Sequence, residues 1–141
     1  MTTPASLTDP RDVLERHRQA AVSRSVEEMR RLYAVDAVHE FPFTAPGLPS
    51  RLEGRDEIVG WIAAGWRSAT FRYERYRVLA TYATDDPATI VVEQEAIGTS
   101  SSTGEFVLPN IVVLTVRDGR IARLRDYVNI LAAAAVVGHD L

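Results

Sequence analysis

The segment Asp118-Gly-Arg-Ile-Ala-Arg-Leu-Arg-Asp-Tyr-Val-Asn129 contains a tight turn followed by a strand. Asp118-Gly119 is a strong hairpin signal, because such a turn requires residues that tolerate positive φ. After the turn, the side chains are expected to alternate between the two faces of a strand, Ile121–Ile130. One face carries Leu124, Asp126, Val128 and Ile130, and the other carries Arg123, Arg125, Tyr127 and Asn129. The carboxylate of Asp126 therefore shares its face with aliphatic residues only.

Three more strands are predicted before this one, at Phe71–Ala83, Thr89–Gly98 and Phe106–Val116. The N-terminal half favours helices instead. Asp9-Pro10 starts a first helix that carries Val13, His17, Ala20 and Ala21 on one face. Ser23 or Ser25 caps a second helix with Val26, Met29, Leu32 and Tyr33 on its apolar face, and a third runs from about Gly54 to Ser68. Between them lie a short strand, Ala37–Phe43, and a loop; Ala132–Val137 forms a final helix or tail. Helices followed by a strand meander predict an α+β fold.

Composition limits the class of protein. A chain of 141 residues predicts one domain over 1–141, with an ordered core at about 8–135. There are no cysteines, and dispersed histidines show no metal-ligand spacing, so we expect no metal site. The formal net charge of −3 predicts no binding to nucleic acid. We also expect no signal peptide and no membrane span, and hence a cytoplasmic location.

Two stretches in the N-terminal half, Leu32–Phe43 and Leu52–Ile58, resemble SnoaL-like polyketide cyclases and phenazine-biosynthesis A/B proteins. The segment Asp118–Asn129 is similar to the last strands of that group and of limonene epoxide hydrolase. The resemblance implies the nuclear transport factor 2-like fold, a cone-shaped, curved antiparallel or mixed sheet with three N-terminal helices on its concave face. This fold hosts cyclases, isomerases, hydrolases, dehydratases and non-catalytic binders, so it does not fix the reaction.

Asp126 is the first candidate catalytic residue. Burial among apolar groups should raise the pKa of its carboxyl and make it an acid or base near neutral pH. In proteins similar to limonene epoxide hydrolase, the resemblance implies that the aspartate of the Arg-Asp-Tyr string is catalytic. The alternative is a salt bridge between Asp126 and an arginine of a neighbouring strand.

Glu93 and Glu95 share one face of their strand, and we predict that Glu95 is catalytic and that Glu93 binds substrate. In the epoxide hydrolase pattern this face carries an arginine and an aspartate, so the Asp–Arg–Asp set is incomplete here. A shift of one residue would place Gln94 there. The alternative is that both glutamates face solvent or a dimer partner.

His17, on the apolar face of the first helix, is a further catalytic candidate, with a satisfied core histidine as the alternative. Other polar and aromatic residues are predicted to line the pocket: His39, Phe41, Asn110, Tyr33 and Trp61. Together with the resemblance to SnoaL-like polyketide cyclases, these residues predict a cofactor-free acid–base enzyme for a small apolar, polyketide-like metabolite. Aldol-type cyclisation, isomerisation and dehydration are the expected reactions. A non-catalytic binding module and epoxide opening are the alternatives.

The strands carry apolar residues on both faces, as Ile90 and Val92 alternate with Val91 in one strand. An antiparallel sheet with one solvated face should be polar on that side. We therefore expect a homodimer formed through the outer face of the sheet.

Overall fold

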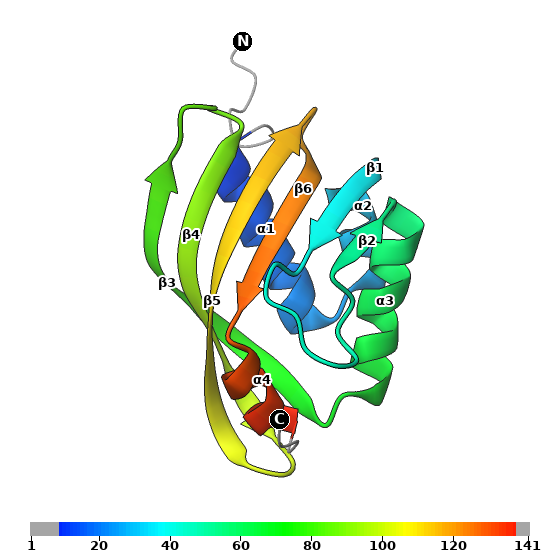
Figure 1. Cartoon of the computed structure of the whole chain (residues 1–141), viewed down its shortest axis with the longest axis vertical. Helices are drawn as coiled ribbons and strands as arrows, with labels where there is room; N and C mark the ends of the chain where they lie inside the picture. The colour runs from blue at the N-terminus through cyan, green and yellow to red at the C-terminus, as the bar shows by residue number, and fades with distance from the viewer. Residues whose placement is uncertain (1–8, 138–141) are drawn as a thin grey trace.

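The computed structural model describes residues 9–137. They form a six-stranded sheet with the strand order β2-β1-β6-β5-β4-β3 and four helices, shown in Figure 1. The helices are α1 (Pro10–Ser23), α2 (Val26–Leu32), α3 (Arg55–Ser68) and α4 (Ile130–Val137). The strands are β1 (Tyr33–Glu40), β2 (Arg51–Glu53), β3 (Phe71–Ala83), β4 (Thr89–Ser100), β5 (Gly104–Arg117) and β6 (Arg120–Val128). The predicted α+β architecture with a curved mixed sheet is confirmed.

The two predicted N-terminal caps are present. The Asp9 side chain accepts a hydrogen bond from the Arg11 backbone N–H at 2.9 Å, and Ser25 accepts one from Glu28 N–H at 3.1 Å. The first helix ends at Ser23, and the C-cap residue Arg24 adopts the left-handed conformation with φ 55°. The Arg24 guanidinium then donates to the Trp66 carbonyl at 3.1 Å and to the Phe71 carbonyl. This one side chain links the end of α1 to α3 and to the start of β3.

The first strand begins four residues earlier than the sequence predicts. Tyr33 was expected on the apolar face of α2, but it pairs with Ile121 as the first residue of β1, and its burial comes from the sheet. The strand ends at Glu40 rather than at Phe43. Its parallel pairing with β6 makes the sheet mixed, and β2, which is only three residues long, pairs antiparallel with it. A strand of three residues is too short for its alternation to be recognised.

The meander of β3 to β6 follows the prediction closely. Asp118 and Gly119 form the expected turn with φ of 54° and 74°. The last strand ends at Val128, and Ile130 starts α4 instead, because the Asn129 side chain accepts a hydrogen bond from Ala132 N–H at 3.0 Å. Alternation alone did not show this change from strand to helix.

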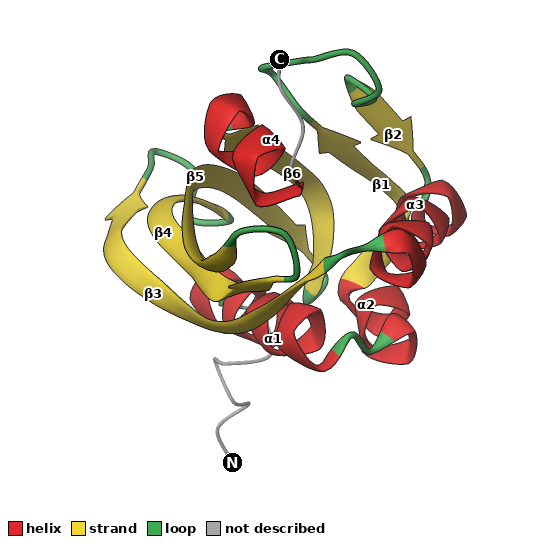
Figure 2. Cartoon of the chain, turned by 90° about the horizontal axis from the view of Figure 1, so that it is seen from below, coloured by secondary structure: helices red, strands yellow, loops and turns green. Residues whose placement is uncertain are grey.

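The sheet curls around the core, as seen from below in Figure 2. We call the curled-in side the inner face; its side chains include Ile90, Val92, Gln94, Ala96, Val112, Leu114, Leu124 and Asp126. The first helix packs across β3, β4 and β5, whereas α3 packs on β1 and β2. At the other end of the inner face, Val136 of α4 packs with Ala96, Phe106 and Leu108. The expected helical cover of the inner face is therefore present, with α4 in addition.

Two irregularities help the sheet to curl. The register of β3 against β4 shifts between Tyr73 and Arg75 and again between Val78 and Ala80. A Cβ on Gly98 would lie 1.9 Å from the Arg72 carbonyl oxygen, so only glycine allows the two strands to approach so closely there. Among the helices of residues 9–137, none has the length and apolar character needed to cross a membrane.

Candidate active site

Asp126 lies on the inner face of β6, as the sequence predicts, opposite Val112 of β5. Its carboxylate is part-buried and accepts one hydrogen bond, from Asn110 Nδ2 to Oδ1 at 2.9 Å. Burial raises the pKa of the Asp126 carboxyl to about 6, although the bond from Asn110 acts in the opposite direction. A neutral amide compensates the buried charge only partly. The carboxyl is therefore poised to take up and release a proton near neutral pH.

The salt-bridge alternative for Asp126 does not hold in the described part of the chain, where no arginine or lysine pairs with it. The arginines beside it in sequence project from the opposite face of β6. Arg123 pairs with Glu40 at 2.6 Å, and the Arg125 guanidinium lies 5.5 Å from the centre of the Tyr127 ring.

Three side chains form a hydrogen-bonded chain at the other end of the site. The Tyr33 hydroxyl is 3.1 Å from His17 Nε2 of α1 and 3.1 Å from His39 Nδ1 of β1. Tyr33 is fully buried and His39 is 5% exposed. The other ring nitrogen of His39, Nε2, is buried and has no hydrogen-bond partner. The chain thus ends in an unpaired polar atom.

All three members of this chain are neutral at physiological pH. Burial, and then the nearby charge of Arg18, lowers the pKa of His17 to about 4. Burial, and then His17, lowers the pKa of His39 to about 3. Burial also raises the pKa of Tyr33, and the charge of Asp126 raises it further.

Strand register relates His39 to Asp126. His39 pairs with Leu124, and Asp126 lies two residues further along the same face of β6. Neighbouring strands are about 4.8 Å apart and two residues span about 6.6 Å, so the two Cα positions are about 8 Å apart. Their side chains project from the same face of the sheet.

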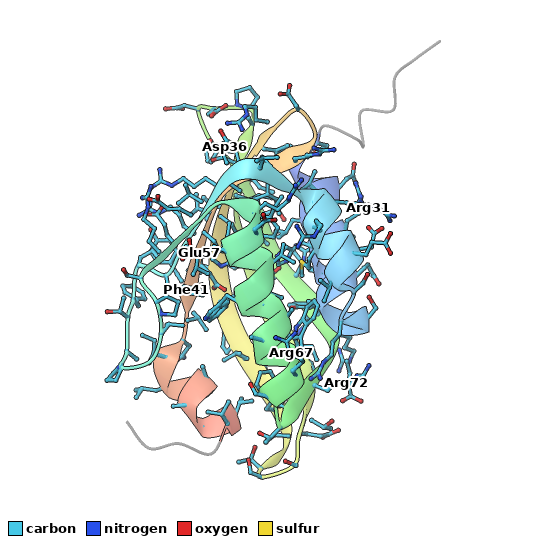
Figure 3. The ribbon with its side chains drawn as sticks, turned by 90° about the vertical axis from the view of Figure 1, so that its right-hand side faces the viewer. Arg31, Asp36, Phe41, Glu57, Arg67 and Arg72 are labelled. Atoms are coloured by element: carbon cyan, nitrogen blue, oxygen red, sulfur yellow. The ribbon has the colours of Figure 1, made fainter. Side chains whose placement is uncertain are left out.

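Aromatic rings extend the site away from His39. The Phe41 ring centre is 4.9 Å from that of His39 and 5.2 Å from that of Trp61 on α3. Figure 3 shows the Phe41 side chain beside α3. Trp61 is 38% exposed, so this row of rings runs from the buried histidine to the surface. Phe41 thus lies between His39 and Trp61 and contacts both rings.

Glu93 and Glu95 require a correction. Both lie on the outer face of β4, where Glu95 pairs with Arg77 at 2.6 Å and Glu93 accepts a hydrogen bond from Tyr82 at 2.6 Å. The inner position is Gln94, which the sequence offered only through a shift of one residue. Alternation separates the two faces of a strand but does not tell which face is covered by helices. The two glutamates therefore do not belong to the candidate site.

Sequence reasoning missed Arg18, Tyr73 and Tyr76, and it gave Gln94 only as an alternative. Gln94 accepts a hydrogen bond at 2.7 Å from Nε of Arg18, which is 7% exposed and also pairs with Glu15. Arg18 lies one helical turn after the buried Leu14, and this spacing could have revealed it. Tyr73 and Tyr76 have ring centres 5.7 Å apart, and burial raises the pKa of both. Strict alternation puts them on opposite faces, whereas the irregularity in β3 brings them together.

A surface hollow of about 480 Å³ lies where β5 and β6 meet α4. Its lining includes Asn110 and Val128, together with Phe43, Tyr127 and Leu131. Asn110 therefore contacts this hollow and also holds Asp126. Within residues 9–137 no three histidine, aspartate or glutamate side chains are grouped so as to hold a metal ion.

The sequence matches the SnoaL-like domain over residues 14–124. An uncharacterised PhzA/B-like protein of Pseudomonas aeruginosa is 32% identical over 108 residues, which cover 76% of this chain and 74% of that protein. The uncharacterised protein YesE of Bacillus subtilis is 29% identical over 118 residues, covering 83% and 79% of the two chains.

Solved structures agree with this relationship. A provisionally assigned isomerase from Bacillus subtilis superposes with a TM-score of 0.84 at 25% identity, covering 96% of this chain and 97% of the other. A provisional polyketide cyclase from Pseudomonas putida gives 0.70 at 18% identity, covering 94% and 98%. An epoxide hydrolase of the limonene type from M. tuberculosis gives 0.68 at 17%, covering 95% and 92%. The expected nuclear transport factor 2-like fold is thus confirmed.

The raised pKa of Asp126 predicts a measurable dependence of stability on pH. Between about pH 4 and pH 6 the folded state holds a proton that the unfolded state has lost, so ionisation at higher pH disfavours folding. At pH 7, Asp126→Asn should therefore be more stable than wild type by about 1–3 kcal/mol, and the difference should vanish near pH 3.5. Urea unfolding at several pH values measures both quantities.

The exposed Asp85 provides the matched control, because Asp85→Asn removes a carboxylate from the surface and should not change the slope with pH. A loss of stability in Asp126→Asn at pH 7 would show that the carboxylate has a stabilising partner, contrary to this description.

Proposed function

The chain belongs to the SnoaL-like domain family, and we propose that it is a cofactor-free enzyme that moves a proton next to a carbonyl group of a small, mostly apolar metabolite. The observation that supports this proposal most strongly is the isolated carboxylate of Asp126 on the inner face. It has one neutral hydrogen-bond partner, and its pKa is raised to about 6. A general base works best when its pKa lies near the working pH.

In this proposal Asp126 removes a proton from the carbon beside the carbonyl and returns it to the same or another atom. Asn110 holds the carboxylate in place through its 2.9 Å hydrogen bond. Isomerisation needs only this transfer, whereas aldol-type cyclisation and dehydration add the formation or breaking of a further bond. All three reactions begin with the same step at Asp126.

The substrate class is inferred from the surroundings of Asp126. The neighbouring inner-face residues are aliphatic or aromatic, including Val112, Leu124, Tyr73 and Tyr76. His17 and His39 are neutral, and the guanidinium of Arg18 is already bonded to Gln94 and Glu15. These groups suit an uncharged ligand with one or two polar atoms.

Epoxide opening is the second candidate, and the buried Arg18 is the observation that favours it. Its guanidinium donates a hydrogen bond to the Gln94 side chain on β4. Gln94 lies opposite Asn110 of β5 in the sheet, and the Asn110 side chain bonds to Asp126. Arg18 of α1 thus places a positive charge at the inner face, although β4 itself has no arginine there. Against this candidate, Arg18 forms no hydrogen bond or ion pair with Asp126 within residues 9–137.

We also propose that the protein forms a homodimer through the outer face of the sheet. Val107 and Ile111 are 46% and 41% exposed there, and the partly buried Val91 and Ile97 extend the same face. On β4 the carboxylates of Glu93 and Glu95 lie between Val91 and Ile97 on this face, where they bond to Tyr82 and Arg77. Exposed apolar residues that adjoin one another on a sheet favour contact with a partner surface.

Proton transfer can be tested before the natural substrate is known. The protein should speed exchange of the α-hydrogens of small apolar ketones, such as 2-tetralone, for deuterium in D₂O. The rate constant should rise with pH through about 6 and then level off, because only the ionised carboxylate of Asp126 accepts a proton. Proton NMR follows the loss of the α-hydrogen signal.

Asp126→Asn should lower this rate by about 10²–10⁴, since an amide cannot act as a base. The control Glu95→Gln removes a carboxylate from the outer face and should leave the rate unchanged. Equal rates for wild type and Asp126→Asn across a panel of ketones would reject the proposed reaction and leave the binding module as the better description.

The dimer proposal predicts that lysine on the outer face separates the protomers. Ile111→Lys places a charge in the middle of the proposed contact, so sedimentation velocity at micromolar concentration should change from dimer to monomer. Val26→Lys is the control, because Val26 is 40% exposed on α2, a helix that packs against α1 and α3. A monomeric wild-type protein would contradict the proposal.

A further inference from the structure

The unpaired Nε2 of His39 is the feature of the inner face that the proposed base does not explain. This nitrogen is buried, the residue is 5% exposed, and no protein atom within residues 9–137 completes its hydrogen bonding. A buried polar atom without a partner is costly in a folded protein. Its partner is therefore expected to come from outside the chain.

We infer that His39 Nε2–H is the donor that holds the carbonyl oxygen of the substrate, and that His17 and Tyr33 fix the proton on that nitrogen. The inference rests on the proposed proton transfer at Asp126 and names its second catalytic residue. It also narrows the substrate to a flat, uncharged ketone or 1,3-dicarbonyl compound. His39 would contact the substrate, whereas Tyr33 and His17 are positioning residues.

Counting protons along the chain supports this assignment. Each neutral imidazole has one N–H and one bare nitrogen, and the Tyr33 hydroxyl has one hydrogen to donate. If His17 Nε2–H donates to the Tyr33 oxygen, the hydroxyl donates to His39 Nδ1. His39 must then carry its own proton on Nε2, the unpaired atom. Every donor of the chain is used in this arrangement except the one that would meet the ligand.

The opposite direction of hydrogen bonding among His17, Tyr33 and His39 is less suitable for holding a carbonyl oxygen. If Tyr33 donates to His17, then His39 Nδ1–H donates to Tyr33, and His39 Nε2 is a bare acceptor. A carbonyl or enolate oxygen has no hydrogen to offer to such an acceptor. The positive charge of Arg18 also disfavours a charged imidazole at His17. The three hydrogen-bonded side chains therefore act through the orientation of their N–H and O–H groups, and none of them becomes charged.

The reaction can be written over His39 and Asp126 with all atoms accounted for. The Asp126 carboxylate takes a proton from the α-carbon, the C–H electrons form a C=C bond, and the carbonyl π electrons move to oxygen. The resulting enolate oxygen accepts the hydrogen bond from His39 Nε2–H, which keeps its proton. Return of the proton from Asp126 to carbon completes the cycle. A spacing of about 8 Å between the two Cα atoms fits a base at the α-carbon and a donor at the carbonyl oxygen of one substrate.

The aromatic row beside His39 accounts for the preference for a flat ligand. The rings of Phe41 and Trp61 continue from the imidazole towards the surface. A molecule whose oxygen bonds to His39 Nε2 would lie with its carbon skeleton against these rings. Stacking suits planar conjugated or ring ketones better than branched aliphatic ones.

The proton on His39 can be observed directly by ¹⁵N NMR of histidine-labelled, full-length protein. The His17→Gln and His39→Gln variants assign the signals, because the chain has three histidines. We expect His39 to be neutral with its proton on Nε2. In Tyr33→Phe, which removes the central hydroxyl, both imidazoles should become mixtures of tautomers. A bare Nε2 on His39 in wild type would overturn the inference.

A stable probe tests the contact with the ligand. 2-Naphthol is flat and carries its oxygen where the enol of 2-tetralone does. Its binding should shift the ¹⁵N signal of His39 Nε2 much more than that of His17. Saturating 2-naphthol that leaves His39 Nε2 unshifted would reject the contact. Neither NMR result depends on turnover, so failure here is distinct from failure of Asp126 as the base.

Exchange of 2-tetralone hydrogens separates the roles of the three residues. His39→Gln, with its shorter amide donor, should lower the rate constant by about 10²-fold, the usual loss for one oxyanion donor. Tyr33→Phe should lower it less while leaving the pH midpoint near 6, because that midpoint belongs to Asp126. Tyr82→Phe, an exposed tyrosine on β3, is the matched control and should have no effect. A shifted pH midpoint in Tyr33→Phe would show that one of the hydrogen-bonded side chains His17, Tyr33 and His39 changes its protonation state, contrary to the inference.

Discussion

The carboxylate of Asp126, held on an apolar face by one neutral amide, is the constraint on which this site depends. A charge in such a place disfavours folding unless a cation compensates it, and no cation of residues 9–137 does so. The same burial that costs stability gives the carboxyl a pKa of about 6. Stability and reactivity are therefore opposed at this residue, as is common at catalytic sites.

The architecture surrounds this carboxylate with apolar side chains and supplies neutral donors nearby. Strand β1 runs parallel to β6 and brings His39 to the same face as Asp126, and α1 crosses the sheet and brings His17 to Tyr33. The irregularity in β3 turns Tyr73 and Tyr76 inward together. Because His17 and His39 are kept neutral by burial, the site has hydrogen-bond donors without a charge that would compensate Asp126.

The sequence predicted the structure correctly where a residue pattern is compatible with only one structure. Alternation around Asp126 located its face, and Asp118-Gly119 located the turn before it. The sequence was misleading where one residue pattern is compatible with two structures. Glu93 and Glu95 were placed inside because alternation does not tell inner from outer, and Tyr33 was placed in a helix because a buried tyrosine fits either element. The contact of Tyr33 with both histidines joins three elements and has no local signal.

The central claim is that burial has made the carboxyl of Asp126 a base for neutral pH. A titration of the ¹³C carboxyl signal of Asp126, assigned with Asp126→Asn, measures this property directly and requires no substrate. The structure predicts a midpoint of about 6. A midpoint near 4, the ordinary value for an aspartate, would mean that water or an unrecognised partner stabilises the charge, and would contradict the account.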